Sequence, residues 1–468
     1  MAGLFALSVD PARYKGPFVE DFFRGTFYQQ NRGEKYAGLV VFNNGQMNGD
    51  SRRGLFRPTF WGSRGEFCGQ AGIGYCGLTP EPLKVMSKFG HWALCFSGNV
   101  LNLAELSVEL QSDGEVFATN DDIEVIAKFI ARGRDFVDGI KIAAKKIKGA
   151  FSLLVITSNG IYVAVCPSGR WPLIIGEKEG AVAVAAESGG FKNLGFKIIR
   201  DLQPGEIIHI NSGKWEQKGI ITDGRRQICS FLWVYTARPE AQIAGIPVSL
   251  VRKRLGATLA RRDIAKGFIP HYVISVPDSG RSHAIGYHQE FCRAAMRGRI
   301  KRLPFFDELL LRFPYSGRSF TRSTQAKRDE EADLKIVPSG ESVDDLLEGF
   351  EGLADLWGGN LSELIVAVCE DSIVRGTQLQ QKLIPRLKSI GVGQIYVRAS
   401  NPPLMAYCPW GKTTQQSELL TERFPDMAGR IKHLGVNGLE YNTVADLIQA
   451  IGLPREELCV DCSLPAGK

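Results

Sequence analysis

An apolar run that ends in two adjacent carboxylates constrains this chain more than any other stretch of its sequence. Residues 366–378 read VAVCEDSIVRGTQ, in which Glu370 and Asp371 separate a short apolar segment from a loop rich in Ser, Gly and Thr. Such a run fits a strand buried on both faces of a parallel sheet, and residues 272–276 and 394–397 repeat the pattern. Ligands of open α/β sheets bind at the carboxyl ends of the strands, so the sequence predicts a ligand site at this loop.

The residue types in this loop suit a sugar phosphate. A loop that leads into a helix offers free backbone N–H groups and the positive end of the helix dipole, and the Ser372 and Thr377 hydroxyls add donors. The two carboxylates can accept hydrogen bonds from ribose hydroxyls and can touch a Mg²⁺-bound substrate. A second loop, residues 276–282 (VPDSGRS), also follows an apolar run. The alternative is a capped helix after a buried strand, with no ligand.

Residues 366–378 resemble the phosphoribosylpyrophosphate (PRPP) loop of type I phosphoribosyltransferases, and the run DSIVRGT resembles that of the glutamine PRPP amidotransferase family. The family's Cys-x-Phe segment is similar to residues 229–239, and its mobile closing loop to residues 317–325. The resemblance covers nearly the whole chain. It departs at Gln378, at Glu370 in place of an Asp, and in an insert over residues 338–363.

This resemblance implies a set of roles for the matching residues. It makes Glu370, Asp371 and Arg318 catalytic, with Arg318 near the pyrophosphate when the loop closes and excludes water. The residues implied to bind substrate are Asp278, Ser279, Gly280 and Arg281 for pyrophosphate, and Ser372, Arg375, Gly376 and Thr377 for the 5-phosphate.

The first 225 or so residues have a different pattern, with short strands, Gly-rich turns and one clear helix over residues 122–132. They resemble the class II glutaminase of the Ntn fold at residues 31–38, 149–152 and 204–208. We therefore expect an α+β Ntn-hydrolase-like sandwich, followed by an α/β type I phosphoribosyltransferase domain with a parallel sheet. The expected divisions are a glutaminase-like domain over residues 1–226, a phosphoribosyltransferase domain over 227–445, and a tail over 446–468.

The same resemblance implies that the glutaminase is inactive. Family members use an N-terminal Cys as nucleophile and its own amine as base, whereas Ala2 stands here. Gly77 replaces the Arg that pairs with the glutamine carboxylate, and Ser97 replaces the Asn of the oxyanion hole. Asp122 remains where the family binds the glutamine amine. The degenerate site comprises Ala2, Arg32, Gly77, Ser97, Gly98 and Asp122. Cys76 and Cys95 lie nearby in sequence and are expected to be core residues.

Four of the ten cysteines match positions of the family's iron–sulfur ligands: Cys229, Cys408, Cys459 and Cys462. Four thiolates are the usual complement of a [4Fe–4S] cluster, so the resemblance implies a cluster with a structural or regulatory role. A Cys₄ zinc site and the absence of any metal remain alternatives.

The charge and composition of the chain indicate which classes of molecule it binds. The net charge of +7 suits a protein that handles polyphosphates. The densest basic stretch, residues 293–302, lacks an aromatic stacking motif, so we expect a solvated helix face and no nucleic acid. No apolar run approaches the ~20 residues that span a bilayer, and the N-terminus lacks a basic region typical of a signal peptide, so we expect a cytoplasmic protein without a membrane partner.

Two functions follow from the resemblance. The first is an enzyme of purine biosynthesis, a homo-oligomer like its family, that converts Mg²⁺-bound PRPP to 5-phosphoribosylamine with ammonia from solution or from a partner glutaminase. A variant of it uses another amine or base as nucleophile. The second is a non-catalytic paralogue that binds PRPP or nucleotides and regulates a true amidotransferase.

Overall fold

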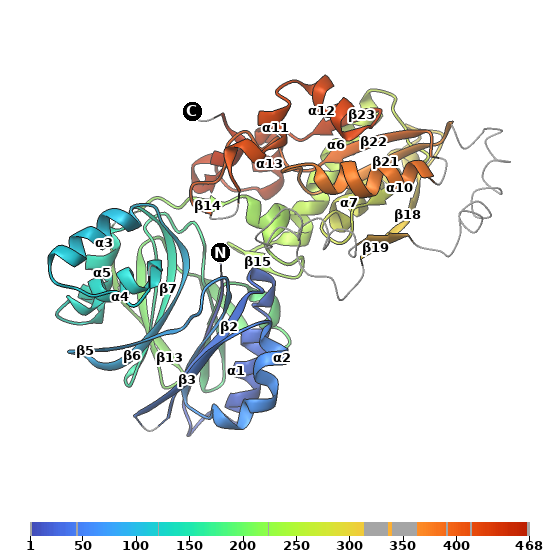
Figure 1. Ribbon diagram of the computed structural model, residues 1–468. Helices are drawn as coiled ribbons and strands as arrows, with labels where there is room; N and C mark the ends of the chain where they lie inside the picture. Colours follow the sequence, from blue (N-terminus) through green and yellow to red (C-terminus); the bar gives the residue numbers. More distant parts are fainter. Residues whose placement is uncertain are drawn as a thin grey trace.

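The computed structural model describes residues 2–312 apart from 44, 120 and 223, residues 336–338, and residues 363–465 apart from 390, 391, 412 and 413. Figure 1 shows two bodies, of which the first, coloured blue to green, carries the N-terminal half of the chain. The second, coloured lime to red, carries the rest. None of the helices in these ranges is long and apolar enough to cross a membrane.

Two antiparallel sheets form the centre of the first body. In the described residues, one sheet has the order β11 (Lys197–Asp201), β9 (Ile174–Lys178), β10 (Ala181–Ala185), β1 (Gly3–Val9), β4 (Ala71–Gly77), β2 (Tyr36–Asn43) and β3 (Gln46–Arg53). The other has the order β13 (Lys214–Ile220), β12 (Glu206–Asn211), β8 (Gly160–Val165), β7 (Gly149–Thr157), β6 (Gly90–Val100) and β5 (Leu83–Ser87).

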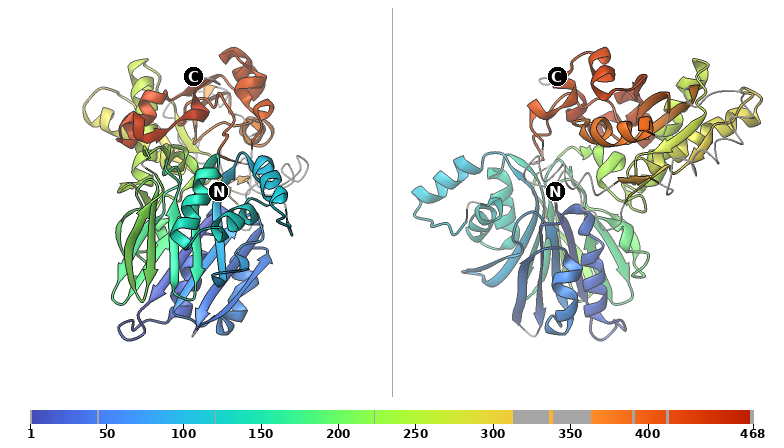
Figure 2. Two further views of the ribbon diagram at one scale, coloured as in Figure 1. Left: turned by 90° about the vertical axis from the view of Figure 1, so that its left-hand side faces the viewer. Right: turned by 45° about the vertical axis from the view of Figure 1, so that its right-hand side comes forward.

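Strand β1 shows why this body has four layers. Its side chains alternate between the two faces, as in any strand. Leu4 and Ala6 join the core between the two sheets. Phe5 and Leu7 point the other way and pack with helices α1 (Phe18–Phe27) and α2 (Phe56–Phe60). Figures 1 and 2 show these two helices on one side of the sheets and α3, α4 and α5 on the opposite side.

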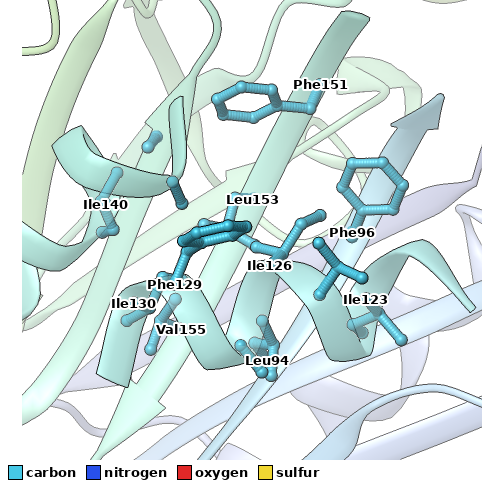
Figure 3. Packing of buried hydrophobic residues seen from close by; sticks show 14 of the residues in the cluster. Leu94, Phe96, Ile123, Ile126, Phe129, Ile130, Ile140, Phe151, Leu153 and Val155 are labelled. Carbon is cyan, nitrogen blue, oxygen red and sulfur yellow. The ribbon is translucent and has the colours of Figure 1, made fainter. Parts of the chain in front are cut away.

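The outer helices of the second sheet make the fourth layer. They are α3 (Leu103–Ser112), α4 (Asp122–Ala131) and α5 (Phe136–Lys146). Ile123, Ile126 and Phe129 of α4 pack on Phe96 and Leu153 of the sheet, as Figure 3 shows. The predicted helix over residues 122–132 and the predicted antiparallel sandwich are thus confirmed.

The second body is built on a parallel sheet. In the described residues its order is β18 (Phe305–Asp307), β17 (Tyr272–Ser275), β21 (Ile365–Glu370), β22 (Gln394–Ala399) and β23 (Gly438–Tyr441). Helices α6 (Val248–Ala265) and α7 (Arg281–Met296) cover one face, and η7 (Leu379–Leu383), α10 (Ile384–Ser389) and α12 (Met427–Leu434) cover the other. Burial on both faces explains the short continuous apolar runs, and the predicted parallel sheet is confirmed.

The C-terminal segment returns to the junction of the two bodies. Helix α13 (Val444–Ile451) packs with α6, and β24 (Leu458–Cys459) pairs in parallel with β14 (Ile228–Cys229). The remaining short elements are β15 (Gln242–Ile243), β16 (Ile246–Pro247), β19 (Leu310–Arg312), β20 (Ile336–Pro338), α11 (Leu420–Arg423), η1 (Gln30–Arg32), η2 (Trp61–Glu66), η3 (Ser188–Gly190), η4 (Leu232–Thr236), η8 (Gln416–Glu418), η9 (Arg455–Glu457) and η10 (Asp461–Ser463).

Candidate functional site

Two loops start side by side at the carboxyl edge of the parallel sheet. Strands β17 and β21 are neighbours, with Ser275 opposite Cys369, and the Val276 N–H donates to the Cys369 carbonyl at 3.0 Å. The loop after β17 turns into α7 at Gly280, where an added Cβ would lie 2.4 Å from the Cys369 carbonyl oxygen. Only glycine lets this loop pack directly on the neighbouring strand. The two loops predicted to bind substrate therefore lie together.

The acidic pair is buried and fixed at the end of β21. Asp371 is 2% exposed, and Glu370 is 7% exposed. The Ser372 hydroxyl donates to the Asp371 carboxylate at 2.6 Å. Their carbonyl oxygens accept the N–H groups of Ser400 and Asn401 at 2.9 and 2.8 Å, which ties the pair to the end of β22. The Asp371 N–H also donates to the Glu370 carboxylate at 3.1 Å, so hydrogen bonds within the protein hold both the backbone and the carboxylates of the pair.

The rest of the loop leads into the helical segment η7–α10. Gly376 adopts a φ of +78°, in the left-handed region that favours glycine. Its carbonyl accepts the Gln380 N–H at 2.9 Å, which starts the helix. The Arg375 guanidinium is turned to Glu418, at 2.6 Å. Thr377 is half-buried beside them.

Charged side chains surround the loop after β17. Arg281 pairs with Glu308 at 2.6 Å and lies 3.5 Å from Asp278. Arg312, at the end of β19, also approaches Asp278, at 3.4 Å. Sequence reasoning did not single out Arg312, because its proximity to the loop depends on strand β19. Arg318, predicted to close over pyrophosphate, lies outside the described residues.

Ala2 borders two cavities in the first body. One encloses about 450 Å³, part of it open to solvent, and is also lined by Tyr75, Glu81, Asp121 and Asp122. The other is smaller and lies between Ala2, Arg32, Ser97 and Leu232, among other residues. The Ala2 N–H donates to the Ser97 hydroxyl at 2.8 Å. Ala2, Gly98 and Asp122 therefore line the first cavity, and Ala2 and Ser97 the second.

A tyrosine occupies the space beside Gly77. An added Cβ at Gly77 would lie 1.9 Å from the Tyr75 hydroxyl oxygen. That hydroxyl bonds to Thr79 at 2.9 Å, Thr79 donates to the Glu81 carboxylate at 2.7 Å, and Glu81 accepts the Phe96 N–H at 2.7 Å. Burial raises the pKa of Tyr75 well above its usual value. No described residue lining this cavity is basic, so none pairs with a ligand carboxylate there.

Arg32 and Asp122 are engaged within the protein. The Asp122 carboxylate accepts the Val100 N–H at 3.0 Å. Arg32 pairs with Glu187 at 2.6 Å, and both side chains are almost fully buried. Glu187 also accepts from the Arg238 N–H at 3.1 Å, which links the two bodies. Sequence reasoning missed Glu187, since nothing local marks it.

Cys76 and Cys95 lie in the core with no exposed surface, as expected. Burial raises the thiol pKa of both, for Cys95 with a further contribution from Glu81. Neither has the exposure or the low pKa of a nucleophilic cysteine.

The four predicted cluster cysteines lie near one another at the junction of the bodies. Cys229 and Cys459 are paired across β14 and β24. Burial raises the pKa of Cys229 well above its usual value, and the nearby Cys459, Cys408 and Cys462 raise it further. Burial likewise raises the pKa of Cys459 and Cys462 to about 12. In the described ranges, however, no three His, Cys, Asp or Glu side chains are arranged to hold a metal ion.

An orphaned donor lies at the same place. The buried Nε–H of Arg170 has no hydrogen-bond partner in the described part of the chain, although this arginine affects the thiols of Cys408 and Cys459 electrostatically. Soft thiolates with a neighbouring unpaired N–H donor fit an iron–sulfur cluster in chemistry, although the thiols are not drawn together into a ligating arrangement.

Comparison with known proteins agrees with this geometry. Residues 79–193 match the glutamine amidotransferase domain family. The amidophosphoribosyltransferase of Methanothermobacter thermautotrophicus is 30% identical over 92% of this chain and 87% of its own length, and that of Bacillus subtilis is 30% identical over 92% and 86%. The solved structure of the B. subtilis glutamine PRPP amidotransferase, complexed with ADP and GMP, superimposes with a TM-score of 0.82 at 27% identity, covering 100% of this chain and 96% of that one. The antiparallel sandwich and the parallel sheet with its paired loops match the fold of this solved structure, and the sequence identity extends over nearly the whole chain. The chain therefore belongs to the amidophosphoribosyltransferase family.

Proposed function

We propose that this chain is a phosphoribosyltransferase of purine biosynthesis that forms 5-phosphoribosylamine from PRPP and ammonia. The observation that carries this proposal is the pair of loops at the carboxyl ends of β17 and β21, with a buried acidic pair at the start of the second. In an open α/β sheet this is where a ligand binds. The family relationship supplies the reaction class.

Each loop has a distinct part in the transfer. Glu370 and Asp371 accept hydrogen bonds from the ribose hydroxyls, and the N–H groups of residues 372–377 hold the 5-phosphate. The loop from Asp278 to Arg281, with Arg318 after closure, holds the pyrophosphate, which arrives with Mg²⁺ as part of the substrate. The bond from ribose C1 to pyrophosphate oxygen breaks, the bond from C1 to nitrogen forms, and the nitrogen then loses a proton. Catalysis is positioning and charge stabilisation.

We also propose that the first domain, residues 1–226, does not hydrolyse glutamine. Ala2 offers no nucleophile beside the cavity, and the phenol of Tyr75 fills the space beside Gly77 where a carboxylate-binding side chain would extend. Ammonia then comes from solution or from a partner glutaminase. The transferase domain spans residues 227–445, the tail 446–468, and the protein forms a homo-oligomer.

A [4Fe–4S] cluster at Cys229, Cys408, Cys459 and Cys462 completes the proposal. The proximity of the four cysteines at the domain junction and the orphaned donor of Arg170 support it. When bound, the cluster would supply a one-electron redox centre and would hold the tail against the first domain. It takes no part in phosphoribosyl transfer.

Pyrophosphate release by anaerobically purified protein tests the function. Reactions contain PRPP and Mg²⁺ with either ammonium or glutamine. C68S serves as a control because Cys68 is exposed and lies in the first body, between η2 and β4. We expect release with ammonium and none above background with glutamine. Equal release with glutamine would refute the inactive glutaminase. PRPP binding without release in either reaction would refute ammonia transfer and leave the regulatory paralogue or a transferase that uses another nucleophile.

A further inference from the structure

Arg170 is a buried cation of the first domain that contacts the three segments carrying Cys229, Cys408, and Cys459 with Cys462. It lies between β8 and β9 and is only 4% exposed. Its carbonyl oxygen accepts the N–H of Cys229 at 3.1 Å, so the backbone of one domain is bonded directly to a thiol-bearing residue of the other.

The side chain of Arg170 touches each of the thiol-bearing segments. Its guanidinium lies 4.1 Å from the ring centre of Trp410, two residues after Cys408. One terminal nitrogen is 3.4 Å from the carboxylate of Asp461, between Cys459 and Cys462, and the other donates to Gln227 at 3.0 Å, two residues before Cys229. Trp410 in turn donates to Asp461 at 3.1 Å. Arg170 thus joins three segments that are far apart in the sequence.

One donor of this arginine is left over. The Nε–H is buried and, within the residues that the structure describes, has no acceptor. Because a buried unpaired donor is costly, such a group is expected to face an acceptor that arrives with a ligand. The ligand implied at this place is held by thiolates, and its sulfur atoms are acceptors. A cation beside several thiolates also offsets their mutual repulsion.

We propose that Arg170 is a positioning residue for the iron–sulfur centre, with its Nε–H donating to a cluster or thiolate sulfur and its charge favouring the reduced form. This inference rests on the cluster proposed above. Hydrogen bonds to sulfur and local charge set the reduction potential of such clusters. The arginine therefore raises the potential and makes the first domain part of the environment of the cluster.

A second contact supports the role of the junction. The Asn99 amide, on β6 two residues after Ser97, donates to the Pro409 carbonyl at 3.0 Å. The loop that carries Cys408 is therefore held by the first domain from two sides, by Asn99 through the backbone and by Arg170 through the Trp410 ring. Trp410 and Cys229 also pack against the hydrophobic core of the first domain.

The test compares R170Q and R170K with a matched control, R52Q. Arg52 also lies over an aromatic ring, 4.5 Å from Phe60, and pairs with Asp50 at 2.7 Å. It belongs to β3 of the first domain, and its contacts with Asp50, Thr59, Ser63 and Phe60 all lie within that domain. Each protein is purified anaerobically. Iron and sulfide content are measured first, and the reduction potential is then followed by electron paramagnetic resonance during a redox titration.

We expect R170Q to shift the one-electron equilibrium of the cluster at least tenfold toward the oxidised form. This corresponds to a reduction potential at least about 59 mV more negative than that of the wild type. R170K should show a smaller shift than R170Q because lysine keeps the positive charge. R52Q should have the wild-type potential. Should R170Q lose its iron, an intermediate potential in iron-loaded R170K supports the inference. Iron-loaded R170Q and R170K with the wild-type potential and spectrum would overturn it. Wild-type protein without iron would overturn the cluster itself, and with it this inference, while leaving the pyrophosphate assay unaffected.

Discussion

A methyl group at Gly280 should separate the two substrate loops, which makes G280A the sharpest test of the transfer site. The added Cβ would lie 2.4 Å from the Cys369 carbonyl oxygen, 2.8 Å from the Val276 oxygen and 2.9 Å from the Val276 nitrogen. All three are main-chain atoms of the central strands or their ends, so no side chain can rotate away. Ordinary van der Waals contact begins near 3.4 Å. The Cβ of G280A would be 1.0 Å closer than that to the Cys369 oxygen (3.4 minus 2.4 Å), so the loop must move by about this distance.

That displacement carries the pyrophosphate loop away from the acidic pair on β21. A misplacement of about 1 Å typically costs about 100-fold in rate, and overpacking a site of this kind lowers the free energy of unfolding by about 1–3 kcal/mol. We therefore expect kcat/KM for PRPP, in the ammonium-dependent release of pyrophosphate, to fall by about 100-fold in G280A.

The control for this change is G65A. A Cβ at Gly65 meets no atom within 4 Å, and this residue is not in the left-handed region, so the variant should keep wild-type activity. Circular dichroism at the assay temperature confirms that G280A is folded. If folded G280A kept kcat/KM within a few-fold of the wild type, the two loops would not form one site.

Three further outcomes follow from the same geometry. Asp371 is 2% exposed, and D371N keeps the shape of its side chain but removes the charge. A hydrogen bond to a charged group contributes about 1.5–3 kcal/mol, so kcat/KM for PRPP should fall by about 10- to 150-fold. Burial, and to a lesser extent the charge of Arg252, lowers the pKa of His283 to about 4, whereas its value in the unfolded chain is about 6.5. The unfolded chain therefore binds a proton before the folded one does, and the free energy of unfolding should fall by up to about 3 kcal/mol as the pH drops from 6.5 to 4. H283N should flatten that dependence in urea titrations at several pH values, and an unchanged slope would contradict the assignment. C459S should purify with far less iron than C68S, whereas equal iron contents would place the metal elsewhere.

The sequence predicted those parts of the molecule that depend on local order. Continuous apolar runs mark the strands of the parallel sheet, and periodic apolar residues mark the helix over residues 122–132, because these preferences belong to each residue and its neighbours. Tyr75 beside Gly77 was not predicted, because the direction of its side chain depends on packing within β4 rather than on the sequence pattern. Arg170 with Asp461 and Arg32 with Glu187 were missed because each pair joins segments far apart in the chain, and only the assembled junction brings them into contact.

This difference bears on why a glutaminase-like domain persists in a chain without its nucleophile. The transfer site is built largely from main-chain geometry, namely the register of β17 and β21 and the glycines of its loops. The first domain reaches the second through backbone bonds, such as that from the Cys229 N–H to the Arg170 carbonyl, and through several side chains. Glu187 accepts from Arg238, Asn99 from β6 holds the Cys408 loop, and Arg170 lies over Trp410. Deleting that domain would remove these three supports at once and expose apolar surface of Trp410 and Cys229. On the proposed function, the first domain is therefore retained as a structural part of the transferase, and the chemistry of its cavity could be lost without cost to that role.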